Sequence, residues 1–288
     1  MSDIFDFETR IDEYAVMGNP IAHSKSPLIH TAFATQTGQR IHYSAIQVDP
    51  GGFSQAVGNF FANGGKGLNV TVPFKQEAWQ LADERSERAE LAGAVNTLFM
   101  RDGQLFGDNT DGVGLVRDLG HNLGINLGGK RILILGAGGA ARGVIQPLLA
   151  QQPQLLFIAN RTADKAHELA ALFNTRSDSD VPHNIIGSGF NDLEGQQFDV
   201  VINATSASLQ GDVPPIPQGV FADDGWCYDM MYGAEPTIFL QWAQQCGVPH
   251  LSDGLGMLVE QAAESFNLWR GLRPETAPVI QQIRSSLR

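Results

Sequence analysis

The chain has 288 residues, of which 43% are hydrophobic, and its 31 acidic residues outnumber its 19 basic residues to give a net charge of −12. A chain of this length and apolar content can bury a substantial core, and the length favours about two domains. Its basic residues are dispersed, whereas a phosphate-binding face needs clustered Lys and Arg, so we expect no nucleic-acid partner.

Membrane and metal signals are missing from the sequence. It contains no apolar run of membrane-spanning length, and it begins with an acidic stretch where a signal peptide would be basic and then apolar. We therefore expect a cytoplasmic protein without membrane contact. Cys227 and Cys246 lie far from any CxxC or His-rich spacing, which predicts two reduced thiols and no metal site.

Predicted strands and helices alternate through the first part of the chain. The apolar run at 14–18 leads into the loop GNPIAHSKSP, and Pro27 suits the first turn of a helix that extends to Gly38 with Ser26 as its N-cap. Three further elements follow: a strand at 42–48, a helix at 53–61 and a strand at 67–72. This alternation is typical of an α/β unit.

Two hydroxyl residues share the loop before the first predicted helix. Capping explains Ser26 about as well as ligand binding does, but it does not explain Ser24 on the same loop. A helix N-terminus attracts a carboxylate, and two hydroxyl groups beside it can bind one. The loop therefore predicts an anion site.

Lys75 follows the strand at 67–72. A lysine at a strand end is usually only solvated, but this one lies at the carboxyl edge of a predicted strand, where open α/β sheets bind their ligands. The next strand candidate, at 94–100, has the polar Asn96 in its middle, and the turn GDNTDG carries Asp111. A helix at 112–123 then bridges the two predicted domains.

A strand, a tight turn and the start of a helix follow one another at 131–143, RILILGAGGAARG. Gly136, Gly138 and Ala141 have the spacing of the dinucleotide-binding fingerprint, in which the backbone approaches a pyrophosphate at a helix N-terminus. An ordinary strand-to-helix turn with small packing residues is the alternative. Residues 1–130 are enough for a domain of their own, so the dinucleotide-binding unit is expected to be a second domain.

The strand at 155–159 is followed by NRTADK. At this place, about 20 residues beyond the glycines, an NAD-binding protein usually has an acidic residue for the ribose 2′-hydroxyl. Here Arg161 can pair with a 2′-phosphate and stack on the adenine, and Lys165 adds another donor. Asn160 and Thr162 can donate too, although both also suit the cap of the next helix. These residues predict NADP as the cofactor.

The last third of the chain returns to the predicted site. A polar, acidic loop is expected at 177–182, and a buried strand at 198–204 places Thr205 at its carboxyl edge, toward the cofactor. The run DGLGMLVEQAAESFNLW opens with two glycines and continues as an amphipathic helix whose first turns present Gln261.

Nine motifs occur in order along the chain: GNPIAHSKSP, NVTVPFK, AVNT, GDNTDG, LGAGGAARG, NRT, INATS, YDMMY and DGLGMLVEQA. Together they resemble the shikimate dehydrogenase family over residues 14–269. The resemblance implies a two-domain α/β protein, with a substrate-binding and catalytic domain at 1–112 plus 254–288 and a Rossmann NADP-binding domain at 113–253. We expect a monomer or a homodimer.

The resemblance also implies a reaction. The C3 carbinol of shikimate loses a hydride to NADP and a proton to the enzyme, which gives 3-dehydroshikimate and NADPH, a step of aromatic amino acid biosynthesis. Lys75 and Asp111 match the family's catalytic pair, with the lysine as the favoured acid and base and the aspartate holding both it and a substrate hydroxyl. Which of the two carries the proton stays open, because burial and a neighbouring carboxylate act on a lysine in opposite directions.

The family's binding positions carry over residue by residue. Met230 matches a methionine near the nicotinamide, and Tyr232 matches a substrate-site tyrosine. The expected substrate-binding residues are Ser24, Ser26, Thr71, Lys75, Asn96, Asp111, Tyr232 and Gln261. The expected cofactor-binding residues are Gly136, Gly138, Gly139, Ala140, Asn160, Arg161, Thr162, Lys165, Thr205, Met230 and Gly254.

Two alternatives stay open. The segment TSASL and Met231 depart from the usual family pattern, and relatives also accept quinate or use NAD, so a quinate or dual quinate/shikimate dehydrogenase is one alternative. The other is a non-catalytic NADP-sensing protein, although the presence of both Lys75 and Asp111 speaks against it.

Overall fold

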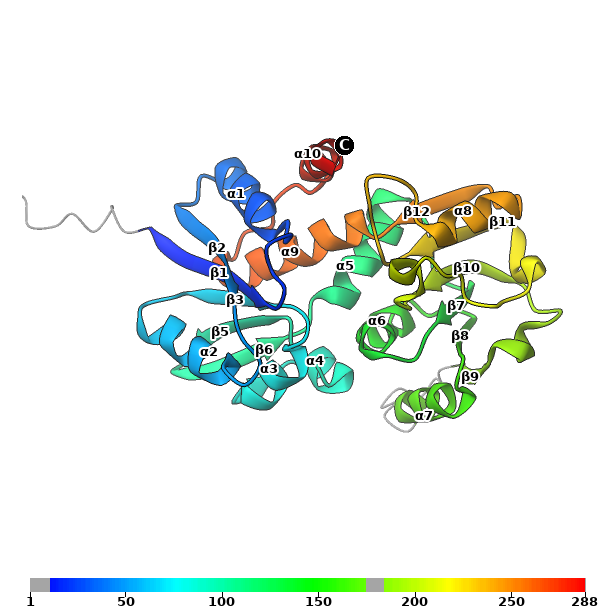
Figure 1. The fold of residues 1–288 in the computed structure, drawn as a ribbon, viewed down its shortest axis with the longest axis horizontal. Helices are drawn as coiled ribbons and strands as arrows, with labels where there is room; N and C mark the ends of the chain where they lie inside the picture. Colours follow the sequence, from blue (N-terminus) through cyan, green and yellow to red (C-terminus); the bar gives the residue numbers. More distant parts are fainter. Residues whose placement is uncertain (1–10, 175–183, 288) are drawn as a thin grey trace, which may run out of the picture. The chain divides into compact units, whose positions relative to one another are not determined.

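The computed structural model describes residues 11–174 and 184–287. The chain divides into two compact units, the first comprising the residues up to Thr110 together with Ala262–Ile283, and the second comprising Asp111–Gln261 and the end of the chain. Each unit is built on a six-stranded sheet, and Figure 1 labels most of the strands and helices in chain order.

The sheet of the first unit is mixed, in the order β2-β1-β3-β5-β6-β4. β1 pairs in parallel with β2 and β3, β5 is antiparallel to both β3 and β6, and β4 is parallel to β6. The carboxyl ends of β1, β3 and β6 and the amino end of β5 therefore lie along one edge, which we call the first site edge. The strands are β1 (Asp12–Gly18), β2 (Ile41–Gln47), β3 (Gly67–Val70), β4 (Glu84–Arg85), β5 (Thr97–Arg101) and β6 (Gln104–Asp108).

Helices provide the crossovers that parallel strands require. In the first unit, α1 (Ser26–Thr37) joins β1 to β2, and α2 (Phe53–Ala62) joins β2 to β3. Phe53 of α2 stacks on Phe74 with ring centroids 4.9 Å apart, in an apolar core that contains both rings. The other helices with residues in this unit are α3 (Lys75–Leu81), α4 (Glu87–Ala92), α9 (Leu255–Arg270) and α10 (Ala277–Leu287), and the division between the units falls within α9 and α10.

The sheet of the second unit has the order β12-β11-β10-β7-β8-β9, and all its pairs are parallel. Counted within the unit, this is the order 3-2-1-4-5-6 of a Rossmann sheet, whose direction of winding reverses between β7 and β10. The strands are β7 (Arg131–Leu135), β8 (Leu155–Asn160), β9 (Ile185–Gly189), β10 (Phe198–Asn203), β11 (Phe221–Asp229) and β12 (His250–Asp253). The expected α/β fold class with a Rossmann unit is confirmed.

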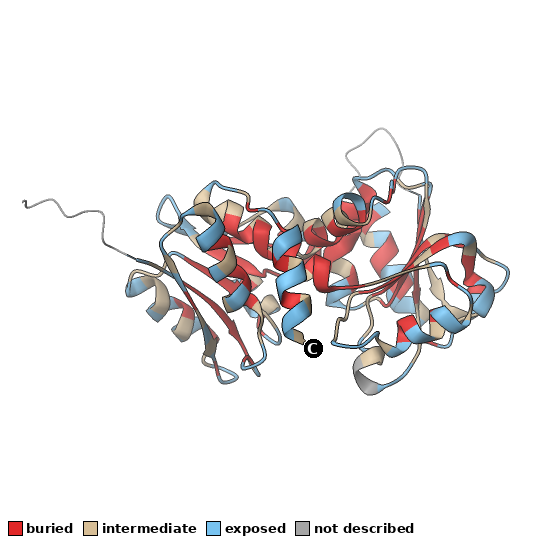
Figure 2. Cartoon of the chain, turned by 90° about the horizontal axis from the view of Figure 1, so that it is seen from above, coloured by how far each residue is buried: buried red, intermediate tan, exposed pale blue. Residues whose placement is uncertain are grey.

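Helices cover this second sheet, and its strands carry the apolar core. Figure 2 shows mostly buried strands and helices whose outer faces are exposed. A short π-helical turn, Asp118–Asn122, extends α5. The helices of the unit are α5 (Asp111–Arg117), α6 (Gly139–Leu149), α7 (Ala163–Asn174) and α8 (Ile238–Gln245), with short 3-10 turns at Phe190–Leu193, Ala207–Gln210 and Gln218–Val220.

Several element bounds differ from the sequence-based predictions. The strand predicted at 94–100 begins only at Thr97, so Asn96 precedes it rather than lying in its middle. The strand predicted to reach residue 72 ends at Val70, because the chain turns before Pro73. The polar loop expected at 177–182 lies outside the described residues. No helix in the described ranges is both long and apolar enough to cross a membrane.

Candidate active site

The first site edge gathers five of the predicted substrate residues. Ser24 and Ser26 lie on and just after the loop that leaves β1, and Thr71 follows β3 directly. Lys75 is the first residue of α3, and Asn96 immediately precedes β5. These residues come from three separate segments, and the strand directions bring all of them to the same edge of the sheet.

Backbone hydrogen bonds fix the loops after β1 and β3 to each other. The N–H of Asn19 donates to the carbonyl of Val72 at 3.1 Å, and the N–H of Thr71 donates to the carbonyl of Met17 at 3.0 Å. Thr71 is thereby held at the end of the sheet beside the serine loop.

The two serines play different local parts. Ser24 Oγ accepts the backbone N–H of Ser26 at 3.3 Å. The prediction of Ser26 as N-cap is wrong: the cap is Lys25, whose carbonyl accepts the N–H of Ile29 at 3.1 Å, and its side chain makes no capping bond. The helix therefore begins one residue earlier, with Ser26 as its first, buried residue and Pro27 in its first turn.

Asn96 anchors the residue that precedes Asp111. Its Oδ1 accepts the N–H of Thr110 at 2.9 Å, and its Nδ2 donates to Thr110 Oγ1, also at 2.9 Å. Thr97 Oγ1 donates to the same Oδ1 at 2.8 Å. All these groups are buried. Part of the Asn96 amide thus holds the backbone from which Asp111 extends.

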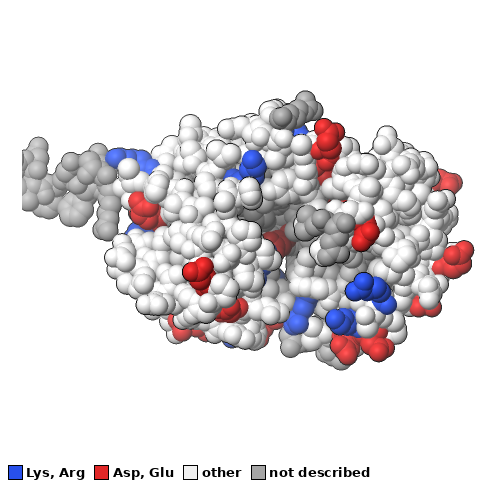
Figure 3. All heavy atoms as spheres, viewed as in Figure 1, with Lys and Arg blue, Asp and Glu red and all other residues white. Residues whose placement is uncertain are grey.

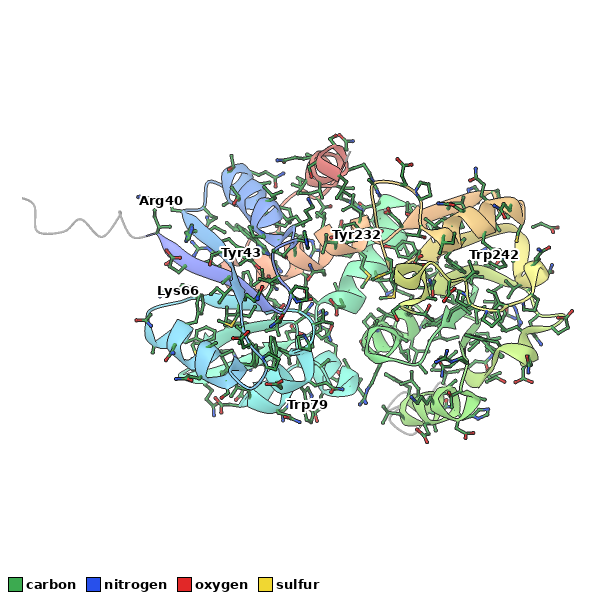
Figure 4. All side chains as sticks on the ribbon, in the orientation of Figure 1. Arg40, Tyr43, Lys66, Trp79, Tyr232 and Trp242 are labelled. Carbon is green, nitrogen blue, oxygen red and sulfur yellow. The ribbon has the colours of Figure 1, made fainter. Side chains whose placement is uncertain are left out.

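A buried polar pair that the sequence analysis missed lies behind this edge. The hydroxyl of Tyr43, which Figure 4 labels, donates to Asn69 Oδ1 at 2.7 Å, and Asn69 Nδ2 donates to Ser265 Oγ at 3.0 Å. Burial raises the pKa of Tyr43 well above its ordinary value, and a side-chain hydrogen bond with Ser26 lowers this pKa by a smaller amount. The phenol therefore remains a hydrogen-bond donor across the physiological range.

Asp108 holds the turn GDNTDG in place. Arg88 donates to both of its carboxylate oxygens, with Nε–Oδ1 and Nη2–Oδ2 distances of 2.7 Å each. Ser86 Oγ and the backbone N–H of Asn109 also donate to Oδ1, at 2.5 and 2.7 Å. Because all these partners are internal, we assign Asp108 a structural role.

In the second unit, the glycine turn has the shape that a pyrophosphate needs. Gly136 has φ +107°, a conformation that favours glycine, and a Cβ there would lie 3.1 Å from Thr205 Cγ2. A Cβ on Gly138 or Gly139 would meet no heavy atom within 4 Å. The N-terminus of α6 begins at Gly139, has no side-chain cap and has no acidic residue in its first turn. Its N–H groups are thus suited to an anionic ligand that approaches the bare backbone.

The end of β8 carries the predicted 2′-phosphate residues. Arg161, Thr162 and Lys165 are exposed there. Asn160 Nδ2 donates to the Thr162 carbonyl at 2.9 Å, so this bond closes the turn rather than capping an N–H of α7. On the face shown in Figure 3, Lys and Arg lie in small separate groups. A local pair of cations suits one phosphate group.

The ends of β10 and β11 are joined through two buried polar residues. Asn203 Oδ1 accepts the hydroxyl of Thr205 at 2.7 Å, and Asn203 Nδ2 donates to Asp229 Oδ1 at 3.2 Å. The N–H of Met230 donates to the carbonyl of Asn203 at 3.0 Å. Thr205 and Met230 are therefore both positioned from Asn203, a role that the motif INATS alone did not reveal.

Met230 also contacts the segment that leads into α9. A Cβ on Gly254 would lie 2.2 Å from the carbonyl oxygen of Met230, so the two backbones touch, and the N–H of Gly254 donates to the carbonyl of Met231 at 3.1 Å. Gln261 lies further along α9, with its Nε2 donating to the Leu258 carbonyl at 2.8 Å. The predicted cofactor residues Met230 and Gly254 are brought together.

Tyr232 is half-buried in the same unit, and Figure 4 labels it. Burial raises the pKa of its phenol, and the charge of Asp253 raises that pKa further. Tyr232 remains a neutral donor at neutral pH.

The predicted site residues are divided between the two units. Lys75 belongs to the first unit, whereas Asp111, Tyr232 and Gln261 belong to the second. Among the described residues, no group of three or more His, Cys, Asp or Glu could hold a metal ion.

These features define the class of protein. The second unit is a Rossmann dinucleotide-binding unit with an open glycine turn and exposed cations at the end of its second strand. The first unit presents hydroxyl, amide and ammonium groups at one sheet edge. The combination is typical of an NADP-dependent oxidoreductase with a small polar substrate.

Comparison with known proteins identifies the family. Three family descriptions match the chain: Shikimate dehydrogenase substrate binding domain over residues 16–98, Shikimate / quinate 5-dehydrogenase over 118–210, and Shikimate 5'-dehydrogenase C-terminal domain over 254–284. The Shikimate dehydrogenase (NADP(+)) of Nitrosospira multiformis is 59% identical, and the match covers 96% of this chain and 98% of that protein. The chain belongs to the shikimate dehydrogenase family, as its nine motifs predicted.

Solved structures of similar proteins support the same family. An Ael1 enzyme from Pseudomonas putida has 48% identity and a TM-score of 0.88, covering 94% of this chain and 97% of that one. A shikimate dehydrogenase from Thermus thermophilus, in complex with NADP(H) and shikimate, has 31% identity and a TM-score of 0.83, covering 96% of this chain and 100% of that one.

Proposed function

We propose that this protein is an NADP-dependent shikimate dehydrogenase that interconverts shikimate and 3-dehydroshikimate in aromatic amino acid biosynthesis. The observation that carries the proposal is the first site edge, where Ser24, Ser26, Thr71, Lys75 and Asn96 come together from separate segments. These groups suit an anionic polyol. Identity of 59% to a named Shikimate dehydrogenase (NADP(+)) supports the same substrate.

Each proposed substrate contact follows from the chemistry of shikimate. Ser24 and Ser26 donate to the carboxylate beside the N-terminus of α1, where the helix dipole favours negative charge. The ring hydroxyls bind Thr71, Asn96, Tyr232 and Gln261, whose hydroxyl and amide groups both donate and accept. A neutral Tyr232 is the protonation state that this role requires.

The cofactor site is proposed on the second unit. The glycine turn and the N-terminus of α6 bind the pyrophosphate, and Arg161 with Lys165 binds the 2′-phosphate. The remaining contacts are proposed at Ala140, Asn160, Thr162, Thr205, Met230 and Gly254. The open space beside Gly138 and Gly139 fits a ligand phosphate at the backbone.

The reaction needs one hydride acceptor and one proton acceptor. NADP, when bound, takes up the hydride from C3 of shikimate. As the C3–O bond becomes a carbonyl, the proton of the hydroxyl passes to Lys75 Nζ or to the carboxylate of Asp111, and the same group returns it in the reverse direction. Two hydrogen bonds between Asn96 and Thr110 fix the backbone directly before Asp111. The protein itself therefore helps to position Asp111, before any substrate binds.

The test is initial-rate formation of NADPH by the purified protein, with shikimate and quinate each paired with NADP and NAD. We expect strong activity with shikimate and NADP only. Comparable rates with quinate would favour the dual-specificity alternative, and comparable rates with NAD would contradict the proposed role of Arg161. Inactivity in every pairing would favour an NADP-sensing protein. The cytoplasmic location and the monomeric or homodimeric state stay predictions.

A further inference from the structure

A buried carboxylate lies in the π-helical turn that follows α5. Asp118 is only 3% exposed, and its Oδ2 accepts the hydroxyl of Tyr228 at 2.7 Å. Its Oδ1 accepts Nδ2 of Asn122 at 2.9 Å. Tyr228 lies in β11 and is completely buried. None of the proposed chemistry uses either group, yet burying a carboxylate is costly unless it is well hydrogen-bonded.

This pair lies against the N-terminus of α9. Tyr228 donates its proton to Asp118, and the backbone amide of Met257, in the first turn of α9, slightly opposes the rise that burial causes in the pKa of this phenol. The N–H of Leu255 is accepted by Asp253 Oδ1 at 3.2 Å. The first N–H groups of a helix have no partners within the helix, and here Asp253 of β12 accepts the first of them.

A glycine allows Asp118 to reach this helix end. A Cβ on Gly256 would lie 1.9 Å from Asp118 Oδ1 and 2.4 Å from its Oδ2. The carboxylate thus lies against the backbone of the first turn of α9, where the helix dipole favours negative charge. We call Asp118, Tyr228 and Gly256 the α9 clamp.

A second buried carboxylate attaches to the same turn. Glu260, one turn further along α9, is completely buried, and its Oε2 lies 3.0 Å from Nε of Arg117. Asn122 Nδ2 donates both to Asp118 Oδ1 and to Glu260 Oε1, the latter at 3.2 Å. The turn at the end of α5 is therefore fixed to α9 at two levels.

The clamp connects two segments that carry predicted site residues, the end of β11 and the first turns of α9. Tyr228 is on β11, Met230 directly follows this strand, and Met230 touches the backbone of Gly254 just ahead of α9. Met257, which follows Gly256 of the clamp, lies one helical turn before Gln261 and on the same face of α9. A shift of the helix end would displace Met230 and Gln261 relative to each other.

We propose that Asp118 and Tyr228 are positioning residues that set the spacing between Met230, near the nicotinamide, and Gln261, near the substrate ring. This inference rests on the proposed function and deepens it. Neither side chain touches substrate or cofactor. Both act through the N-terminus of α9, and their loss leaves the binding groups in place but poorly aligned for hydride transfer.

The test compares Tyr228→Phe with Tyr14→Phe. Tyr14 is a matched control, since it is also buried and its hydroxyl also bonds a charged side chain, Arg270 Nη1 at 3.3 Å, away from α9's first turn. For each protein we would measure kcat/KM for shikimate, the affinity for NADPH, the melting temperature, and the deuterium isotope effect with shikimate labelled at C3.

Tyr228→Phe should lower kcat/KM by about 10- to 100-fold, the cost of a misplacement of about 1 Å. Its isotope effect should rise toward the intrinsic value, because hydride transfer becomes slower than product release. Tyr14→Phe should leave both quantities unchanged. Asp118→Asn keeps one acceptor oxygen and should give a smaller loss with the same rise in the isotope effect.

The outcomes separate the two claims. A wild-type protein without activity on shikimate and NADP overturns the proposed function and this inference with it. An active wild type whose Tyr228→Phe variant keeps its kcat/KM, or loses activity with an unchanged isotope effect, overturns the positioning role alone. If Tyr228→Phe does not fold, the isotope effect of Asp118→Asn decides the question in the same way.

Discussion

Substitution of Gly138 by alanine should separate cofactor binding from stability. Gly138 is the residue before α6, its φ of −86° and ψ of −173° suit any residue, and a Cβ there would meet no heavy atom within 4 Å. Alanine is a poorer N-cap than glycine by roughly 0.5–1 kcal/mol, but it also lowers the entropy of the unfolded chain by a similar amount. The two effects offset, so we expect the melting temperature to change by less than about 3 °C.

The same methyl group occupies the space through which a pyrophosphate must approach the backbone. Loss of one charge-assisted hydrogen bond costs about 1.5–3 kcal/mol, which corresponds to a roughly 10- to 100-fold weaker binding of NADPH. Fluorescence titration with NADPH measures this affinity, and thermal unfolding followed by circular dichroism measures the stability.

Gly136→Ala is the matched contrast. Gly136 has φ +107°, and its Cβ would lie 3.1 Å from Thr205 Cγ2. A non-glycine residue in such a conformation costs about 1–3 kcal/mol, so this variant should melt about 3–9 °C lower. If Gly138→Ala binds NADPH as the wild type does, the pyrophosphate does not lie at this turn. If it melts as low as Gly136→Ala, the assignment of open space at Gly138 is wrong.

Three further changes test the remaining groups. Lys75→Ala should lower kcat by at least about 10²-fold, the usual effect of removing a positioned acid or base, and should change the KM for shikimate less. An unchanged kcat would remove Lys75 from the mechanism. Arg161→Ala should raise KM for NADP far more than for NAD in initial-rate assays, and equal losses would refute the 2′-phosphate contact. Burial lowers the pKa of His30 to about 3, against about 6.5 in an unfolded chain. Between these two pH values the folded state binds fewer protons than the unfolded state. The free energy of unfolding therefore falls as the pH drops below about 6.5, by up to ~1.4 kcal/mol per pH unit. His30→Phe keeps an aromatic ring against Tyr43, whose ring stacks on His30 with centroids 4.2 Å apart. In urea unfolding at pH 7, 6 and 5, this variant should show a weaker dependence of the free energy of unfolding on pH. An unchanged dependence would assign the effect to other groups.

The Rossmann unit was readable from the sequence because its signals are local. A short apolar strand, the glycines of the turn and a helix start lie within 131–143, and the presence of Asn160 and Arg161 at the end of β8, where an NAD-binding protein usually has an acidic residue, is equally local. The hairpin of β5 and β6 was also readable but was missed. Asp102 and Gly103 both have positive φ, 52° and 82°, which is the two-residue turn that an Asp-Gly pair between strands favours.

The buried polar networks could not be predicted in this way. Tyr43 and Asn69 come from different strands, and Ser265 lies 196 residues beyond Asn69, so no local pattern links them. Asp118 and Tyr228 are 110 residues apart. Their partners depend on how helices pack on the sheets, and a polar residue in an otherwise apolar run shows only that some partner is needed.

The reverse reaction tests the central claim most directly. The protein would be mixed with 3-dehydroshikimate and NADPH, NADPH consumption would be followed by absorbance, and the product would be identified by NMR. We predict consumption of one NADPH per molecule of shikimate formed. No NADPH consumption above the protein-free rate, or a product other than shikimate, would contradict the account.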